Sequence, residues 1–306
     1  MLKILSIGGA QIEAYLDKKF KKITTHVTGS AINTAKNYKA FGHPVEARLW
    51  LGEDKHGQII TNDLKKHHIN SVISVIPSTQ TPYTLYLVTG KNKNISLVEK
   101  ENKLTNNLFY KDASLLQSTN WIHLSGLNCT PSQINSVFEQ AFKKIAIPLT
   151  WSPGQRQITD GFHAFDFILK HTVILTINKK EILTFTHRKG FDRAIRDLFH
   201  TGVKIIVVTN HARAVQVITP RERFTILPPH GFISDYAGAG DRFASTFTSY
   251  AINTFDIPLA MQMATFHSHL LLMSQGADSS LMSKKALEQK FQREKKKYLV
   301  HLYEYL

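Results

Sequence analysis

Short β-branched runs alternate with helical stretches along most of this chain, and this alternation most limits the folds open to it. Strand-like runs occupy residues 2–7, 45–51, 121–125, 173–177 and 204–209. Helical patterns occupy residues 31–41, 58–67, 131–144 and 259–275. Strands that alternate with helices are typical of βαβ units. The sequence therefore predicts an α/β fold, a doubly wound and mostly parallel sheet with helices on both faces, which binds ligands beyond the carboxyl ends of its strands.

Two segments interrupt the alternation. Residues 11–28 have a strand-like pattern between the first strand and the first helix, and residues 81–98 read as a hairpin with a Gly/Asn/Lys turn. No internal repeat or low-complexity linker divides the chain. We therefore expect a single domain over residues 1–306, with strands near 11–28 and 81–98 as insertions.

The composition excludes several classes of protein. With 306 residues, 42% of them hydrophobic, the chain can bury a large core. It has no apolar run of 18 residues, and its first residues lack the pattern of a secretory signal, so no membrane partner is expected. Cys129 is the only cysteine, which excludes a disulfide framework and predicts a cytoplasmic protein.

The net charge of +15 raises the question of nucleic-acid binding. The basic residues are spread along the chain, and no nucleic-acid-binding motif accompanies the dense runs at 18–22 and 293–297. We expect a solvated basic surface and no nucleic-acid partner, although salt-sensitive binding to DNA or RNA would be the sign of the alternative. The 15 histidines show no zinc-binding spacing.

The segment 235–243, Asp-Tyr-Ala-Gly-Ala-Gly-Asp-Arg-Phe, holds the strongest chemical signal. Glycines before a helix allow a tight turn and leave N–H groups free to bind an anion. Asp241 beside such a site could take a proton from an attacking hydroxyl, and an anion hole with a base suits phosphoryl transfer to an alcohol. Asp241 as a simple helix cap remains the local alternative.

Four segments together resemble the ribokinase (PfkB) family of sugar and nucleoside kinases. They are Gly-Ala-Gly-Asp-x-Phe at 238–243, Ile-Gly-Gly-Ala-Gln-Ile-Glu at 7–13, Gly-Ser-Ala-Ile-Asn-Thr-Ala at 29–35, and Asn-Lys-Lys-Glu at 178–181. Phe41-Gly42 and the segment Leu-Gly-Glu-Asp-Lys-His-Gly at 51–57 follow the third of these. The resemblance covers about residues 1–290 and implies a ribokinase-like fold, in which 11–28 and 81–98 form a small β-sheet lid that excludes water.

The resemblance implies a kinase that transfers the γ-phosphoryl group of ATP to a primary hydroxyl of a sugar or nucleoside. Asp241 would be the catalytic base. The anion hole would consist of Gly238, Ala239 and Gly240. The acceptor would contact Glu13, Gly29, Ser30 and Asn33.

The same resemblance implies the donor site and its cofactors. The nucleotide would contact Asn178, Thr209, Gly238 and Gly240. Glu181 would hold Mg²⁺ through a water molecule, and a monovalent cation could bind near Asp235. From the residues alone, Asn178 and Glu181 lie one helical turn apart, so they could equally form a capping box.

Several positions depart from the family pattern. Glu13 stands where the family has Asp, and Ser30 replaces the second glycine of a pair. The glycine-rich nucleotide segment is replaced by Thr-Asn-His-Ala-Arg-Ala at 209–214, which brings His211 to the nucleotide. This leaves two alternatives open: altered nucleotide contacts, or a catalytically decayed relative that senses a sugar or nucleotide. The segment Trp-Ser-Pro-Gly-Gln at 151–155 resembles nucleoside-kinase-like members, and an exposed lid edge could pair two chains as a homodimer.

Overall fold

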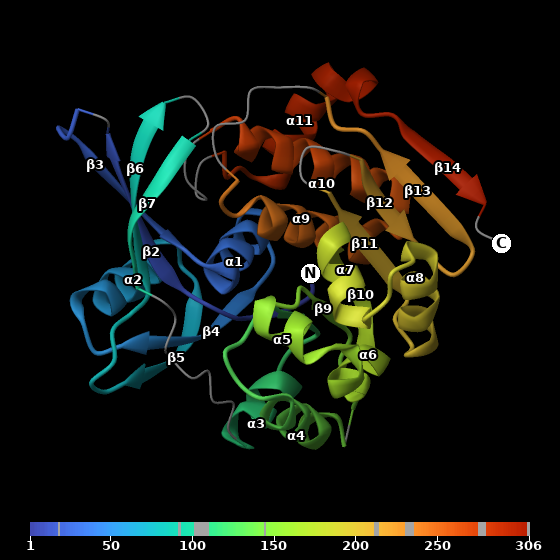
Figure 1. Cartoon of the computed structure of the whole chain (residues 1–306), viewed down its shortest axis with the longest axis horizontal. Coiled ribbons are helices and arrows are strands. Elements are labelled where there is room, and N and C mark those ends of the chain that lie inside the picture. The colour runs from blue at the N-terminus through green and yellow to red at the C-terminus, as the bar shows by residue number, and fades with distance from the viewer. Residues whose placement is uncertain are drawn as a thin grey trace.

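The computed structural model describes residues 1–17, 19–90, 93–100, 110–143, 145–210, 214–229, 236–274 and 280–304. Its main element is a 10-stranded sheet in the order β14-β13-β12-β11-β10-β9-β8-β1-β4-β5 (Figure 1). The strands are β1 (Ile4–Ile7), β4 (Val45–Gly52), β5 (Asn70–Ile76), β8 (Trp121–Leu124), β9 (Leu149–Trp151), β10 (Thr172–Asn178), β11 (Ile205–Thr209), β12 (Val215–Ile218), β13 (Glu222–Ile226) and β14 (Val300–Glu304).

All pairings from β5 across to β11 are parallel, and β12, β13 and β14 extend the sheet in antiparallel fashion. The chain passes from β1 to β4 and β5 on one side, and later to β8 on the other side. The strand order therefore reverses at β1, where a doubly wound sheet opens a crevice at its carboxyl edge. The predicted α/β class is confirmed.

Helices cover both faces of the sheet (Figure 1). One face packs against α1 (Ser30–Ala40), α2 (Lys55–Lys66), α9 (Ala239–Thr254), α10 (Ile257–Leu272) and α11 (Lys284–Glu294). The other face packs against α3 (Tyr110–Gln117), α4 (Pro131–Phe142), α5 (Gln155–Asp160), α6 (Asp166–His171), α7 (Lys179–Thr186) and α8 (Phe191–His200). Neighbouring strand residues such as Ile4 and Leu5 belong to opposite cores, as alternation along a strand requires.

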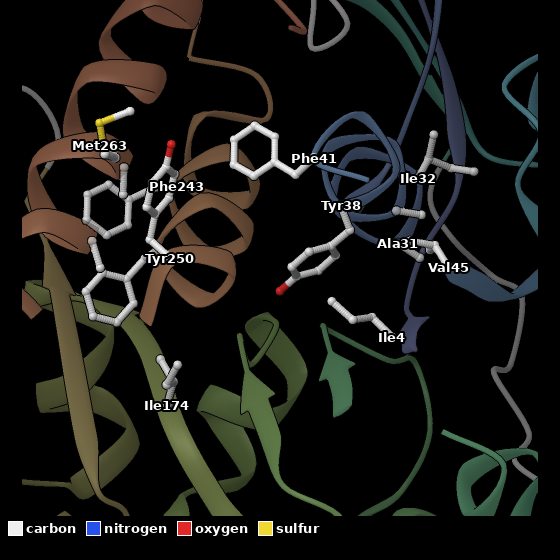
Figure 2. Close-up of a cluster of buried hydrophobic side chains, with 14 of the residues drawn as sticks. Ile4, Ala31, Ile32, Tyr38, Phe41, Val45, Ile174, Phe243, Tyr250 and Met263 are labelled. Carbon is white, nitrogen blue, oxygen red and sulfur yellow. The ribbon is translucent and has the colours of Figure 1, made fainter. Parts of the chain in front are cut away.

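The packing of α1 against α9 brings distant parts of the sequence together. Figure 2 shows Phe41, which directly follows α1, projecting toward the side chains of α9 and α10, whereas Tyr38 of α1 points toward the sheet. The rings of Phe41 and Tyr250 meet edge to face, with centroids 6.0 Å apart. Burial of such aromatic residues is a large favourable term in folding. This contact fixes the C-terminal end of α1 beside the C-terminal half of α9.

A 4-stranded sheet in the order β3-β2-β6-β7 stands beside β4 and α2 (Figure 1). Its strands are β2 (Gln11–Asp17), β3 (Ile23–Thr28), β6 (Tyr83–Gly90) and β7 (Lys93–Lys100), so both insertions contribute to it. Residues 91–92 of the expected hairpin turn lie outside the described residues. Because β2 follows β1 directly, the small sheet begins at the carboxyl edge of the large one.

Asp54 and Thr81 attach the small sheet to the large one. Asp54 Oδ1 accepts hydrogen bonds from Gly57 N and from Thr81 Oγ1, each at 2.8 Å, and Asp54 Oδ2 accepts one from Thr81 N at 2.7 Å. Gly52 N donates to Thr81 Oγ1 at 3.0 Å. A Cβ at Gly52 would lie 2.2 Å from the carbonyl oxygen of Thr79, so this approach requires glycine. The cap formed by Asp54 also starts α2 at residue 55, ahead of the predicted 58.

No helix among the described residues is long and apolar enough to cross a membrane.

The helix that the sequence predicts from residue 259 begins earlier, at Ile257, as α10. There Asp256 accepts a hydrogen bond from Leu259 N at 2.8 Å, which caps α10.

Candidate active site

The Gly-Ala-Gly-Asp turn opens α9. The N-cap residue is Gly238, whose φ of 70° lies in the left-handed region that favours glycine. No side chain among the described residues caps this helix, so the carboxylate of Asp241 is not the cap. The N–H of Ala239 donates to the carbonyl of Tyr236 at 3.3 Å. The N–H groups of Gly240 and Asp241, which have no acceptor within the helix, are therefore the better anion donors.

The carboxylate of Asp241 is held by α1. Asn33 Nδ2 donates to Asp241 Oδ2 at 2.8 Å, and Thr28 Oγ1 donates to Asn33 Oδ1 at 3.1 Å, which fixes the orientation of the amide. Burial raises the pKa of Asp241 to about 6, while the hydrogen bond from Asn33 and the charge of Arg242 act in the opposite direction. A carboxylate with this pKa can accept a proton near neutral pH.

Asp241 faces a cavity of about 260 Å³ at the carboxyl edge of β1. The described lining residues are Gly9, Ala10, Gln11, Glu13, Thr28, Gly29, Ser30, Asn33, Pro82, Gly238 and Asp241. This lining contains two carboxylates and no lysine, arginine or histidine. All four residues predicted to contact the acceptor lie here.

Glu13 is buried in the wall of this cavity and is oriented by its neighbours on β2. Its Oε1 accepts a hydrogen bond from Gln11 Nε2 at 3.1 Å, and its Oε2 accepts one from Tyr15 Oη at 3.0 Å. Residues two apart on a strand share a face, so this arrangement was available from the sequence but was not predicted. Gln11, Tyr15 and Thr28 are therefore additions to the predicted site.

Gly29 needs its glycine. Its φ is 112°, and a Cβ there would lie 2.6 Å from both Gly9 O and Ala10 Cα. Gly29→Ala is expected to lower the free energy of unfolding by about 1–3 kcal/mol, the usual cost of a strained backbone position. Gly190, whose Cβ would meet open space, is the matched control: Gly190→Ala should cost less than about 1 kcal/mol. Urea unfolding of both variants checks this, and equal losses would contradict it.

A second cavity, of about 280 Å³, lies on the other side of the same helical turn. Its described lining residues are Asn178, Thr209, Val215, Tyr236, Ala239, Gly240, Phe243, Ser268 and Leu272. Asn178 and Thr209 end the adjacent strands β10 and β11, which explains why they meet. The residues predicted to contact the nucleotide are thus brought to this cavity, apart from Gly238, which lines the first. Tyr236, Phe243 and Ser268 were not predicted.

Asn178 and Glu181 form a complete capping box at the start of α7. Asn178 Oδ1 accepts from the N–H groups of Lys180 and Glu181 at 2.9 and 2.8 Å, and Glu181 Oε2 accepts from Asn178 N at 2.9 Å. The local alternative from the sequence is therefore realised. It leaves the second oxygen of Glu181 to reach a hydrated metal ion, since Mg²⁺ usually keeps several waters.

The described residues contain no group of three or more His, Cys, Asp or Glu side chains that could hold a metal ion. A Mg²⁺ ion here would therefore rely on phosphate oxygens and water, with Glu181 as a carboxylate beyond the waters; this donor set fits Mg²⁺. Asp235 and His211, predicted near a monovalent cation and the nucleotide, lie outside the described residues.

Comparison with known proteins identifies one family for this chain. A family model described as the pfkB family of carbohydrate kinases matches residues 1–293. The bifunctional ribokinase/ribose-5-phosphate isomerase A of Fructilactobacillus sanfranciscensis is 29% identical over 126 residues. That match covers 39% of this chain and only 23% of the relative's length.

Solved structures share the fold over the full length. A carbohydrate kinase from Agrobacterium tumefaciens has a TM-score of 0.79 at 17% identity and covers 99% of this chain and 100% of its own. A candidate ribokinase II from E. coli, in complex with ATP and Mg²⁺, has a TM-score of 0.78 at 19% identity, over 96% of this chain and 100% of its own. The nucleoside kinase of Methanocaldococcus jannaschii has a TM-score of 0.73 at 19% identity, over 96% and 99%.

Proposed function

Because the chain belongs to the pfkB family of carbohydrate kinases, we propose that it transfers the γ-phosphoryl group of ATP to a primary hydroxyl of a sugar or nucleoside. As a member of this family, the chain is a phosphotransferase with an alcohol acceptor. The identity of the acceptor, the use of ATP and Mg²⁺, and the role of each site residue are proposals for this chain.

One observation carries the proposal: a single helical turn separates the two cavities. Asp241 and Gly238 line the first cavity, whereas Ala239 and Gly240 line the second. A phosphoryl group passing from a nucleotide in the second cavity to an alcohol in the first would cross the N–H groups of Gly240 and Asp241. A nucleotide and an acceptor bound in this way would lie on opposite sides of the anion site, as in-line transfer requires.

The residues of this turn would have different roles in the proposed reaction. The acceptor hydroxyl gives its proton to Asp241, its oxygen forms a bond to the γ-phosphorus, and the bond from that phosphorus to the β–γ bridging oxygen breaks to release ADP. The N–H groups of Gly240 and Asp241 stabilise the charge on the transferring group. When bound, Mg²⁺ supplies neutralisation of phosphate charge, and Asn178 and Glu181 would hold it through water.

The charge of the first cavity favours an uncharged acceptor. Glu13 and Asp241 are the only ionisable side chains in its described lining, and both are acids. A sugar phosphate would bring further negative charge beside them, which costs binding energy. We propose a neutral polyol held by Glu13, Gly29 and Asn33. A neutral monosaccharide should therefore be phosphorylated, and the same sugar already carrying a phosphate at another carbon should not; the reverse preference would contradict the proposal.

The small sheet is proposed to act as the lid over the acceptor. Gln11 and Glu13 of β2 and Pro82, directly before β6, line the first cavity. Exclusion of water by this sheet would prevent hydrolysis of ATP. The edge strand β3, paired in the described structure with β2, is the proposed contact of a homodimer.

The pH dependence follows from the pKa of Asp241. Since burial raises this pKa to about 6, the base is protonated below that pH and ionised above it. We expect kcat/KM to be constant near pH 7–8 and to fall about tenfold per pH unit below pH 6. The measurement is a pH–rate profile with saturating ATP. An acid limb near pH 4, typical of an exposed carboxylate, would contradict the assignment.

Glu181→Gln separates metal binding from helix capping. Glutamine can take the same place in a capping box, so the melting temperature should stay within about 2 °C of wild type. Loss of the charge should raise the Mg²⁺ concentration needed for half-maximal rate by about 3–10-fold. Asn178→Ala breaks the box and should lower the melting temperature as well. If Glu181→Gln shows wild-type Mg²⁺ dependence, Glu181 only caps the helix.

A further inference from the structure

A buried arginine follows the proposed base directly. Arg242 is 3% exposed, and its Nη1 lies 2.9 Å from His267 Nε2 of α10. A guanidinium has no acceptor and does not lose its proton in proteins, so His267 Nε2 must accept this hydrogen bond. The proton of the ring is then on Nδ1, which donates to Thr246 Oγ1 at 2.9 Å. Burial and the charge of Arg242 hold the pKa of His267 well below its ordinary value, which keeps the ring neutral.

α10 holds the first turn of α9 at a second point. Ser268 Oγ donates to the carbonyl of Ala239 at 3.0 Å, next to the contact between Arg242 and His267. Asn33 of α1 holds the same turn from the other side through Asp241. The anion-binding turn is therefore fixed between α1 and α10. Arg242 and Ala239 make its contacts with α10.

The positive charge of Arg242 is unfavourable in the first turn of a helix. A cation in the first turn opposes the partial positive charge of the helix N-terminus, and burial of a charge adds a further cost. An anion in the same place offsets both costs. Among the described residues, the Asp241 carboxylate is an anion of the same turn, and a phosphoryl group bound at the N–H groups of Gly240 and Asp241 would be a second.

We propose that Arg242 is a positioning residue for phosphoryl transfer, whose buried guanidinium, fixed by His267, keeps the Asp241 carboxylate ionised and strengthens the anion site. This inference rests on Asp241 acting as the base. Among the described residues, the groups around Asp241 are Asn33 from α1, which is neutral, Glu13 of β2, an acid that lines the same cavity, and Arg242 of its own helix. His267 of α10, behind them, is neutral. Arg242 thus supplies the positive field on the base.

The test is the acid limb of the pH–rate profile in Arg242→Met. Methionine keeps much of the length of the arginine side chain, but it removes the donor to His267 Nε2, so some loss of stability is expected. Relative to its own rate at pH 8, the variant should be about tenfold slower than wild type at pH 5, because the base would be protonated over about one further pH unit. Affinity for pyrophosphate, measured by calorimetry without turnover, should fall about 3–30-fold, as loss of a charged partner implies.

Three further variants make the result decisive. Arg242→Met with His267→Phe removes both partners and keeps a ring against Phe41, so it serves if the single variant fails to fold. Arg242→Lys keeps the charge and should retain the acid limb. Arg223→Gln, which removes a surface cation paired with Asp192, should leave the profile unchanged.

A wild-type acid limb and wild-type pyrophosphate affinity in folded Arg242→Met would overturn this inference. Arg242 would then only stabilise the packing of α9 against α10. Absence of turnover by the wild-type protein with any acceptor would instead overturn the proposed function. The two failures are therefore distinguishable.

Discussion

Asp241→Asn is expected to lower kcat by roughly 10²–10⁴-fold, the contribution that a general base makes. Asparagine matches the size of aspartate, and its Oδ1 can still accept the hydrogen bond from Asn33 Nδ2. The fold and the affinity for both substrates should therefore be preserved. Single-turnover kinetics, with binding measured by calorimetry, checks both halves of the prediction.

Asp256→Asn is the matched control for this change. Asp256 caps α10 through Leu259 N, and asparagine is an equally good cap, so activity and stability should stay at the wild-type level. A folded Asp241→Asn protein with near-normal kcat would remove Asp241 from the chemistry. A loss of affinity for both substrates, with kcat unchanged, would make it a structural residue.

Asn33→Ala is expected to have the second largest effect, a fall in kcat/KM of roughly 10–150-fold, since a hydrogen bond to a charged group contributes about 1.5–3 kcal/mol. Asn33 lines the acceptor cavity and also orients Asp241, so both acceptor KM and kcat should suffer. The hydrogen bond lowers the pKa of Asp241; its loss should move the acid limb to higher pH. Steady-state kinetics between pH 5 and 8 measures all three.

Thr28→Val is expected to lower kcat/KM less than Asn33→Ala does. It removes the hydroxyl that orients the Asn33 amide but leaves the hydrogen bond to Asp241 possible, so the loss should be smaller, about 2–10-fold. ATP affinity should change little in either variant, because neither residue lines the second cavity. An equal loss for ATP and the acceptor would move the acceptor site away from this edge of the sheet.

The sequence predicted much of this fold because its signals are local. Alternating strands and helices follow from periodicity, and the glycines at 238 and 240 mark the start of α9. The contact between Asn33 and Asp241 spans 208 positions of the sequence, and no spacing rule predicts it. It depends on the packing of α1 against α9, which only the folded core supplies.

Other features could not be predicted from the sequence, for different physical reasons. Asn178 and Glu181 matched both a capping box and a metal site, and the sequence could not choose because both use the same helical spacing. The box is formed, and it is compatible with a hydrated ion. The engagement of the Ala239 N–H with the Tyr236 carbonyl depends on a turn conformation. The contact of Arg242 with His267 depends on the approach of α10.

Release of ADP with neutral monosaccharides and nucleosides as acceptors tests the central claim most directly. The wild-type protein with ATP and Mg²⁺ should release ADP with at least one neutral acceptor, in step with a phosphomonoester product detected by mass, and Asp241→Asn should not do so at a comparable rate. Binding of ATP and an acceptor without ADP release from any member of the panel would contradict the account. It would indicate a relative that keeps the fold as a sensor of sugars or nucleotides.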